Sequence, residues 1–210
     1  MNKEISRKRL VHGDVLEIEI DNLGFAYFKY INVQKINPDS SYPDLIRIYK
    51  NLYEHPINNL ESLDRELLVA PKLISGRLGT FKALKIRIVA NENVFEEEKI
   101  MPDVKIGYPD HLYGFEEEKY EKWKVKKDMG DSIKSYFTTL DKVRHLEWAG
   151  AMNITVIPFR IKLELLKLQG KDIKLEYGFQ DWHEEFIYLQ SINLPVYSLL
   201  NPETRDFAYE

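Results

Sequence analysis

The sequence contains no cysteine, and this absence removes several kinds of chemistry at once. Disulfide bonds, thiolate metal sites and a cysteine nucleophile are excluded, and a chain without cysteine fits a reducing compartment. Long apolar runs are also missing, since no stretch approaches the roughly 20 residues needed to cross a bilayer. Residues 1–9 carry positive charge, but no apolar segment of the kind found in secretory signals follows them. We therefore expect a cytoplasmic protein with no membrane partner.

Catalytic signatures are equally scarce. The sequence has no His-Glu-x-x-His, no Gly-x-Ser-x-Gly, no phosphate-binding loop and no dinucleotide fingerprint. The histidines are dispersed and none stands at the spacing of a helical metal pair: His12, His55, His111, His145 and His183. We expect no catalytic residue, no metal and no cofactor. The enzymatic alternative requires a deep pocket that joins His111 or His183 to several carboxylates.

Aromatic residues, in contrast, are abundant. The 210 residues include 13 Tyr and 10 Phe, a density typical of β-rich cores or recognition surfaces. Hydrophobic residues form 44% and charged residues 30% of the chain, which argues against global disorder. The length permits one domain or two small ones, and either arrangement can bury a core.

The most informative stretch is residues 13–33, which read GDVLEIEIDNLGFAYFKYINV. Apolar residues from Val15 to Ile20 are interleaved with glutamates, close to the period-two pattern of a half-buried strand. Residues 21–24 supply turn chemistry, because Asn tolerates and Gly favours positive φ. The aromatic run that follows suits a pleated surface. These residues predict a β-hairpin that opens a small sheet.

This hairpin resembles the opening of the immunity protein 26 family of bacterial polymorphic toxin systems. Members of that family begin with a Gly-Asp-hydrophobic strand, here Gly13-Asp14-Val15, and an acidic or Asn/Gly turn. An aromatic strand follows at once, here residues 24–28. The resemblance continues more loosely through residues 45–49 and 81–86, and it covers roughly the first half of the chain. It implies a protein that binds and neutralises a cognate toxin.

The remaining pattern predicts a β-rich α+β fold. Strands are expected at Leu45–Tyr49, Glu66–Pro71 and Phe81–Ala90, which would complete an N-terminal antiparallel barrel-like sheet in residues 1–100. A mixed α+β part in residues 101–210, packed on that sheet, would carry one or two helices, and a single domain is the alternative. Its predicted strands are Tyr120–Val125, Ser132–Thr138, Arg144–Trp148 and Ile173–Tyr177. Its predicted helices are Ile157–Leu168 and Asp181–Leu189.

Charge is segregated along the chain although the net charge is only −4. Counted from the sequence, the segments 1–90, 91–118, 119–174 and 175–210 carry +3, −7, +6 and −6. An acidic surface of this kind would attract a basic partner and raise its association rate. The candidate toxin-binding residues are therefore the acids of the second segment: Glu96, Glu97, Glu98, Asp103, Glu116, Glu117 and Glu118. Solvated loops, or ion pairs between residues 91–118 and 119–174, are the alternative explanation.

Taken together, these observations favour a non-enzymatic immunity protein that binds a toxin with a basic surface and blocks it by stoichiometric occlusion. A nucleic-acid-binding or general protein-binding module on a small β-barrel is the competing hypothesis. Residues 119–127, KYEKWKVKK, interleave lysines with aromatics as such a module requires. The surrounding acids and a pI near 5.8 argue against a coherent positive surface, so nucleic acid is not the expected partner.

Overall fold

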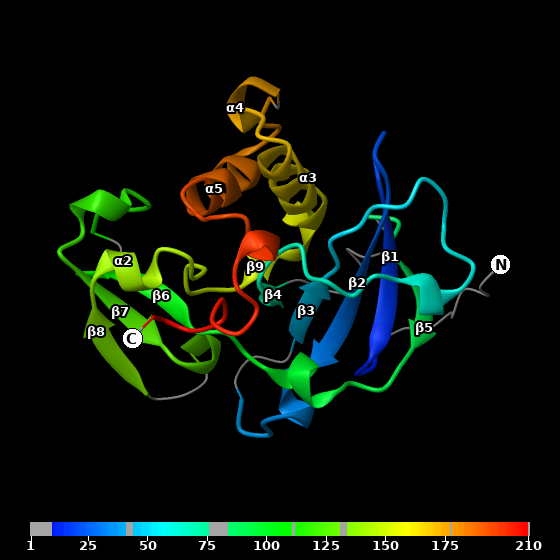
Figure 1. Ribbon diagram of the computed structural model, residues 1–210, viewed down its shortest axis with the longest axis horizontal. Coiled ribbons are helices and arrows are strands. Elements are labelled where there is room, and N and C mark those ends of the chain that lie inside the picture. The colour runs from blue at the N-terminus through cyan, green and yellow to red at the C-terminus, as the bar shows by residue number, and fades with distance from the viewer. Residues whose placement is uncertain are drawn as a thin grey trace. The chain divides into compact units, whose positions relative to one another are not determined.

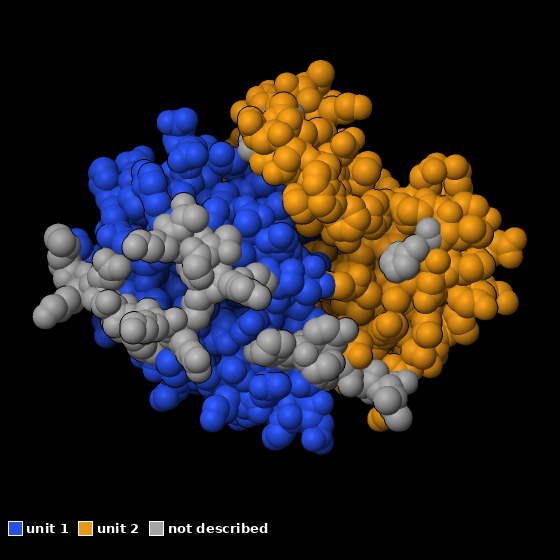
Figure 2. All heavy atoms as spheres, turned by 180° about the vertical axis from the view of Figure 1, so that it is seen from behind, with its two compact units in different colours: residues 1–99, 151–164 blue, residues 100–150, 165–210 orange. Residues whose placement is uncertain are grey.

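The computed structural model of the chain describes residues 10–40, 44–75, 84–110, 112–130, 134–176 and 178–209 (Figure 1). The chain divides into two compact units, which Figure 2 draws in different colours. Unit 1 consists of residues 1–99 and 151–164, and unit 2 consists of residues 100–150 and 165–210. Part of the second half of the sequence therefore belongs to the unit that contains the N-terminal hairpin.

Unit 1 contains a six-stranded sheet with the order β5-β1-β2-β3-β4-β9. Neighbouring strands from β5 to β4 pair antiparallel, whereas β4 and β9 pair in parallel. The order begins at β5 and ends at β9, so within the described residues the sheet is open and does not close into a barrel. The strands are β1 (Asp14–Ile20), β2 (Gly24–Asn32), β3 (Asp44–Ile48), β4 (Lys72–Ser75), β5 (Arg87–Asn91) and β9 (Met152–Asn153).

The predicted opening hairpin is confirmed as β1 and β2, in register from Val15 opposite Lys29 to Ile20 opposite Gly24. Gly24 has φ +112°, and a Cβ at this position would lie 2.4 Å from the carbonyl oxygen of Tyr53. The approach is close because Phe25 and Tyr53 exchange backbone hydrogen bonds of 2.8 and 3.0 Å. Only glycine combines this backbone angle with so near a neighbour.

Unit 2 contains an antiparallel sheet with the order β6-β7-β8. Its strands are β6 (Val104–Tyr108), β7 (Lys122–Lys126) and β8 (Ser135–Thr138). The helices α2 (Leu140–Val143), α4 (Ile173–Glu176) and α5 (Trp182–Ser191) belong to the same unit, and α3 (Ile157–Leu168) begins in unit 1 and ends in unit 2. None of the helices in the described ranges is both long and apolar enough to span a membrane.

Both predicted helices are confirmed. Gly170, with φ +68°, follows α3 closely. Asp181 caps α5, because its side chain accepts the backbone N–H of His183 and of Glu184. Short 3-10 turns complete the structure: η1 (Val33–Lys35), η2 (Leu60–Ser62), η3 (Glu96–Lys99), η4 (Glu117–Lys119), η5 (Asp128–Gly130), η6 (Ile154–Val156) and η7 (Tyr197–Leu199).

Two of the predicted strands are wrong. Of Glu66–Pro71, only Leu67 makes an isolated bridge, to Tyr49, and residues 67–71 are buried as a loop. Arg144–Trp148 also forms no strand, although Trp148 bridges once to Lys105. The four consecutive residues 145–148 are all buried. The alternation of polar and apolar residues in the sequence therefore does not correspond to an exposed and a buried face of a strand.

Two further predictions need correction. Ile173–Tyr177 contains the helix α4, because the Asp172 side chain accepts the backbone N–H groups of Lys174 and Leu175 and favours a helical turn. Phe81–Ala90 becomes a strand only from Arg87, after a turn in which Lys85 has φ +55°. Residues 81–83 and 132–133, and Tyr177, lie outside the described ranges. Within those ranges, nine strands in two sheets and four helices confirm the α+β class.

Candidate functional site

The predicted acidic residues of η3 divide into exposed and buried side chains. Glu96 and Glu97 are exposed. Glu98 is buried, and its Oε2 lies 2.6 Å from Nζ of Lys29, a fully buried residue of β2. Lys29 also donates to the carbonyl oxygen of Asn93 (2.7 Å), and Arg47 donates to the carbonyl oxygen of Glu98 (3.2 Å). Glu98 therefore anchors η3 to β2 and β3.

Asp103 is buried in unit 2, where it joins three parts of the chain. Its Oδ2 accepts from Nζ of Lys127 at 2.6 Å and from the backbone N–H of Ala208 at 3.3 Å. The backbone N–H of Asp103 in turn donates to the carbonyl oxygen of Asp206 (2.8 Å). The carboxylate thus holds β6, the end of β7 and the C-terminal segment together.

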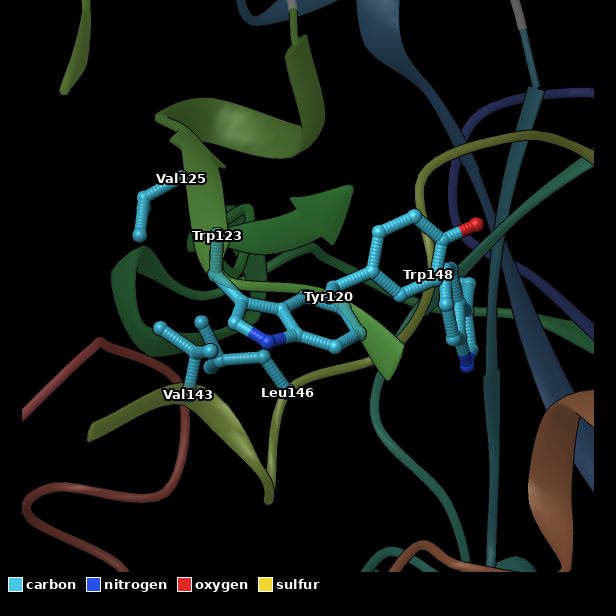
Figure 3. Close-up of a cluster of buried hydrophobic side chains, with 6 residues drawn as sticks. All are labelled: Tyr120, Trp123, Val125, Val143, Leu146 and Trp148. Carbon is cyan, nitrogen blue, oxygen red and sulfur yellow. The ribbon is translucent and has the colours of Figure 1, made fainter. Parts of the chain in front are cut away.

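Glu117 pairs with a lysine inside an aromatic core. Its Oε1 lies 2.7 Å from Nζ of Lys105, and both side chains are buried. The Lys105 ammonium also lies over the rings of Trp123 and Trp148, 5.5 and 5.8 Å from their centroids. Burial lowers the pKa of Lys105, while Glu117 opposes that shift. Figure 3 shows the surrounding cluster, which comprises Tyr120, Trp123, Val125, Val143, Leu146 and Trp148.

The last two predicted acids are exposed and form surface ion pairs. Glu116 lies 2.7 Å from Nζ of Lys119, and Glu118 lies 2.8 Å from Nη2 of Arg144. Ion pairs between residues 91–118 and 119–174, the alternative explanation of the charge pattern, therefore occur, as Asp103–Lys127 also illustrates. The accessible predicted acids are Glu96 and Glu97 of unit 1 and Glu116 and Glu118 of unit 2. A toxin-binding role for any of the seven stays a prediction.

A different surface emerges on α5, where the exposed face is apolar. Trp182, Phe186 and Leu189 are 66%, 43% and 43% exposed, and their spacing of four and three places them on one side of the helix. The opposite side is buried through Ile187 and Ser191. We call the three exposed residues the α5 stripe. The sequence contained this signal, but apolar residues at helical spacing are usually assigned to a core.

The surroundings of the α5 stripe are acidic. Asp181, Glu184 and Glu185 occupy the cap and the first turn of α5, and the last turn contains no basic residue. Glu185 is exposed beside Phe186 in the sequence. In the sequence as a whole, the segment 175–210 has seven acidic side chains and one basic side chain, Arg205. The α5 stripe is therefore an apolar surface with a negative border.

The residues of the enzymatic alternative are not brought together in the described structure. His111 lies outside the described ranges. The ring of His183 stacks on Trp182, with centroids 3.6 Å apart, and its Nδ1 lies 3.9 Å from Asp181. A pocket of about 230 Å³ in unit 1 is lined by Glu19, Asp21, Leu84, Lys85, Pro158 and Lys162 and includes no histidine. Across the described parts of the chain, no group of three or more His, Asp or Glu residues is arranged to hold a metal ion.

No protein-family model, curated protein or solved structure matches this chain. The resemblance to the immunity protein 26 family therefore stays a prediction from the sequence, and the α5 stripe is the feature from which a function can be argued.

Proposed function

We propose that this chain is an immunity protein that binds a cognate bacterial toxin and blocks it by stoichiometric occlusion. The observation that carries the proposal is the α5 stripe, an exposed row of one tryptophan, one phenylalanine and one leucine with an acidic border. The family resemblance of the N-terminal hairpin supplies the class of partner. The binding surface and the family resemblance lie in different parts of the chain, so they support the proposal independently.

The chemistry of the α5 stripe suits a protein partner. Large aromatic side chains lose little conformational entropy on binding, and Trp is among the residues most enriched at the energetic centres of interfaces. An amphipathic helix presents such anchors at the spacing of four and three seen for Trp182, Phe186 and Leu189. Truncating a central anchor of this type costs about 2–4 kcal/mol of binding free energy, or roughly 30-fold or more in affinity.

The acidic border defines the partner further. Asp181 and Glu185 would lie at the rim of the interface, where charge affects the association rate more than the final affinity. A toxin with a basic surface around an apolar groove is the complementary partner. The exposed acids Glu116 and Glu118, which belong to the same unit, would add to this long-range attraction.

The test combines capture with neutralisation. The chain serves as bait in lysate of the source cells at low and at moderate salt, and the gene of any captured toxin is then expressed alone and together with this chain. We expect an equimolar complex and restored growth on co-expression. Failure of the chain to neutralise the captured protein would contradict the proposal.

Variants of the α5 stripe make this test specific. Trp182→Ala with Phe186→Ala should abolish growth rescue and weaken the complex by two orders of magnitude or more, since two anchors are lost. Tyr108→Ala with Phe137→Ala is the matched control, because it removes two exposed aromatics elsewhere in unit 2. Equal rescue by both double variants would exclude the α5 stripe as the toxin-binding surface.

A further inference from the structure

Strand β7 presents three lysines on one face of the unit 2 sheet. Lys122, Lys124 and Lys126 alternate with Trp123 and Val125, and the latter two are fully buried in the aromatic core. Alternate residues of a strand point to the same face and lie roughly 6.6–6.8 Å apart. The lysines therefore form a row on the face of the sheet opposite the aromatic core, where Lys122 is exposed and Lys124 and Lys126 are half-buried.

Two exposed aromatic rings lie on the same face as this row. Tyr108 of β6 pairs with Lys122, and Phe137 of β8 pairs with Lys124, so each ring shares the face of its lysine partner. The side chains of Tyr108 and Phe137 are 46% and 53% exposed, and their rings meet edge to face with centroids 5.0 Å apart. We call these five residues the basic face.

The lysines of the basic face differ from Lys105 and Lys127, the other two lysines on or next to β6 and β7, in their charge balance. Lys105 and Lys127 each have a carboxylate within 2.7 Å, at Glu117 and Asp103 respectively. No carboxylate is paired with Lys122, Lys124 or Lys126 among the described residues. Within the described ranges, three lysines without a carboxylate partner therefore stand in one row, in a chain whose net charge is −4.

We propose that the basic face binds single-stranded nucleic acid. Evenly spaced ammonium groups neutralise successive phosphates, and exposed rings stack with unpaired bases, the combination by which proteins hold single strands without reading their sequence. An acidic peptide would satisfy the lysines but offers no regular series of flat bases for Tyr108 and Phe137. Duplex DNA would satisfy the lysines and leave the rings unused. This site goes beyond the proposed toxin binding and uses none of the residues of the α5 stripe.

The experiment measures fluorescence anisotropy of a labelled oligo-dT and a labelled oligo-U of about 12 nucleotides with the full chain, at several salt concentrations. We expect saturable binding that weakens as salt rises. Replacing the three lysines together by alanine should weaken binding at least about tenfold, and should reduce the slope of log K against log salt by about 2, since each phosphate contact contributes roughly 0.7. Phe137→Ala should weaken binding about fivefold or more through lost stacking.

A matched triple variant separates this site from general charge effects. Lys35 of unit 1 and Lys171 and Lys174 of unit 2 are exposed lysines that do not belong to the basic face, and their joint replacement by alanine changes the net charge equally. We expect this control to bind within about twofold of the unaltered chain, because salt screens the attraction of exposed charges that do not contact the oligonucleotide. The variant Trp182→Ala with Phe186→Ala should likewise keep its oligonucleotide affinity, which distinguishes failure of this proposal from failure of toxin binding.

Four results would overturn the assignment. The first is absence of saturable oligonucleotide binding by the unaltered chain, and the second is an equal loss of affinity in the two triple-lysine variants. The third is binding of a duplex of the same length as tightly as the single strand, together with no effect of Phe137→Ala. The fourth is competition by polyglutamate as effective as that by unlabelled oligonucleotide, which would identify an acidic peptide as the ligand. Unfolding curves of each variant confirm that it is folded before binding is compared.

Discussion

Lys105 is a cation without access to water, held between two tryptophans and one carboxylate. The charged form of Lys105 depends on Glu117, because a buried ammonium group without a counter-charge carries the full free-energy cost of desolvation. The carbonyl oxygen of Arg144 accepts a second hydrogen bond from Lys105 at 2.7 Å. Lys105 and Glu117 therefore depend on each other: removing either side chain would leave the other charge unpaired and destabilise the core of unit 2.

Glu117→Gln should lower the free energy of unfolding by about 3–5 kcal/mol, the usual cost of breaking a buried pair by removing one partner. The adjacent Glu118→Gln is the matched control, because that side chain is 77% exposed and its pair with Arg144 should contribute about 1 kcal/mol or less. Urea unfolding of the two variants measures the difference. Equal effects of the two substitutions would show that the Lys105–Glu117 pair is not a buried structural element.

At the scale of elements, the β1–β2 hairpin depends on the close approach of Gly24 to Tyr53. Gly24→Ala should destabilise the protein by several kcal/mol, because both the backbone angle and the 2.4 Å contact with a carbonyl oxygen oppose a Cβ. Gly170→Ala tests the backbone angle alone, since Gly170 has φ +68° and nothing within 4 Å of the added atom, and it should cost about 1 kcal/mol. Thermal unfolding of both variants distinguishes the two contributions, and similar losses would contradict a role for the contact.

Elements with a local signal could be predicted from the sequence, and those set by distant contacts could not. The start of α5 could be predicted, because the Asp181 side chain caps backbone N–H groups no more than three residues away. The β1–β2 turn could be predicted because Asn22 and Gly24, which adopt positive φ, lie within it. The charge pattern predicts Glu98 and Glu117 as accessible toxin-binding acids, because each belongs to a run of three glutamates. Their partners lie in other elements: Glu98 pairs with Lys29 of β2, 69 residues earlier, and Glu117 pairs with Lys105 of β6. No local pattern marks which glutamate of a run is buried.

At the scale of the whole molecule, the segregated charge of the sequence resolves into two kinds of surface within unit 2. The acidic residues around α5 and the lysines of the basic face occur in one compact unit, and the buried pair with Glu117 removes the charge of Lys105 in β6 from solvent. A basic toxin would therefore bind at the α5 stripe and a nucleic acid at the basic face, so the two proposed activities can be separated by mutation.

The stability of the whole protein should fall as the pH drops below about 6.5, because burial lowers the pKa values of both His12 and His145. His145 Nε2 donates to the carbonyl oxygen of Phe207 at 2.7 Å, and its Nδ1 is buried with no hydrogen-bond partner. Protonation of Nδ1 would therefore place a buried positive charge near Lys105, which Asp206 and Asp103 offset only in part, and would loosen the C-terminal segment.

The sign of this pH dependence follows from linkage. A histidine with a lowered pKa in the folded state binds its proton more readily when unfolded, so its contribution is complete above about pH 6.5 and is lost as the pH falls through the folded pKa. Each histidine can contribute a slope of at most about 1.4 kcal/mol per pH unit. Urea unfolding between about pH 8 and pH 5 should show this decline, and His145→Asn should flatten it while His55→Asn, an exposed histidine, leaves it unchanged. A profile that keeps its full slope in His145→Asn would assign the acid sensitivity to His12 or to the carboxylates instead.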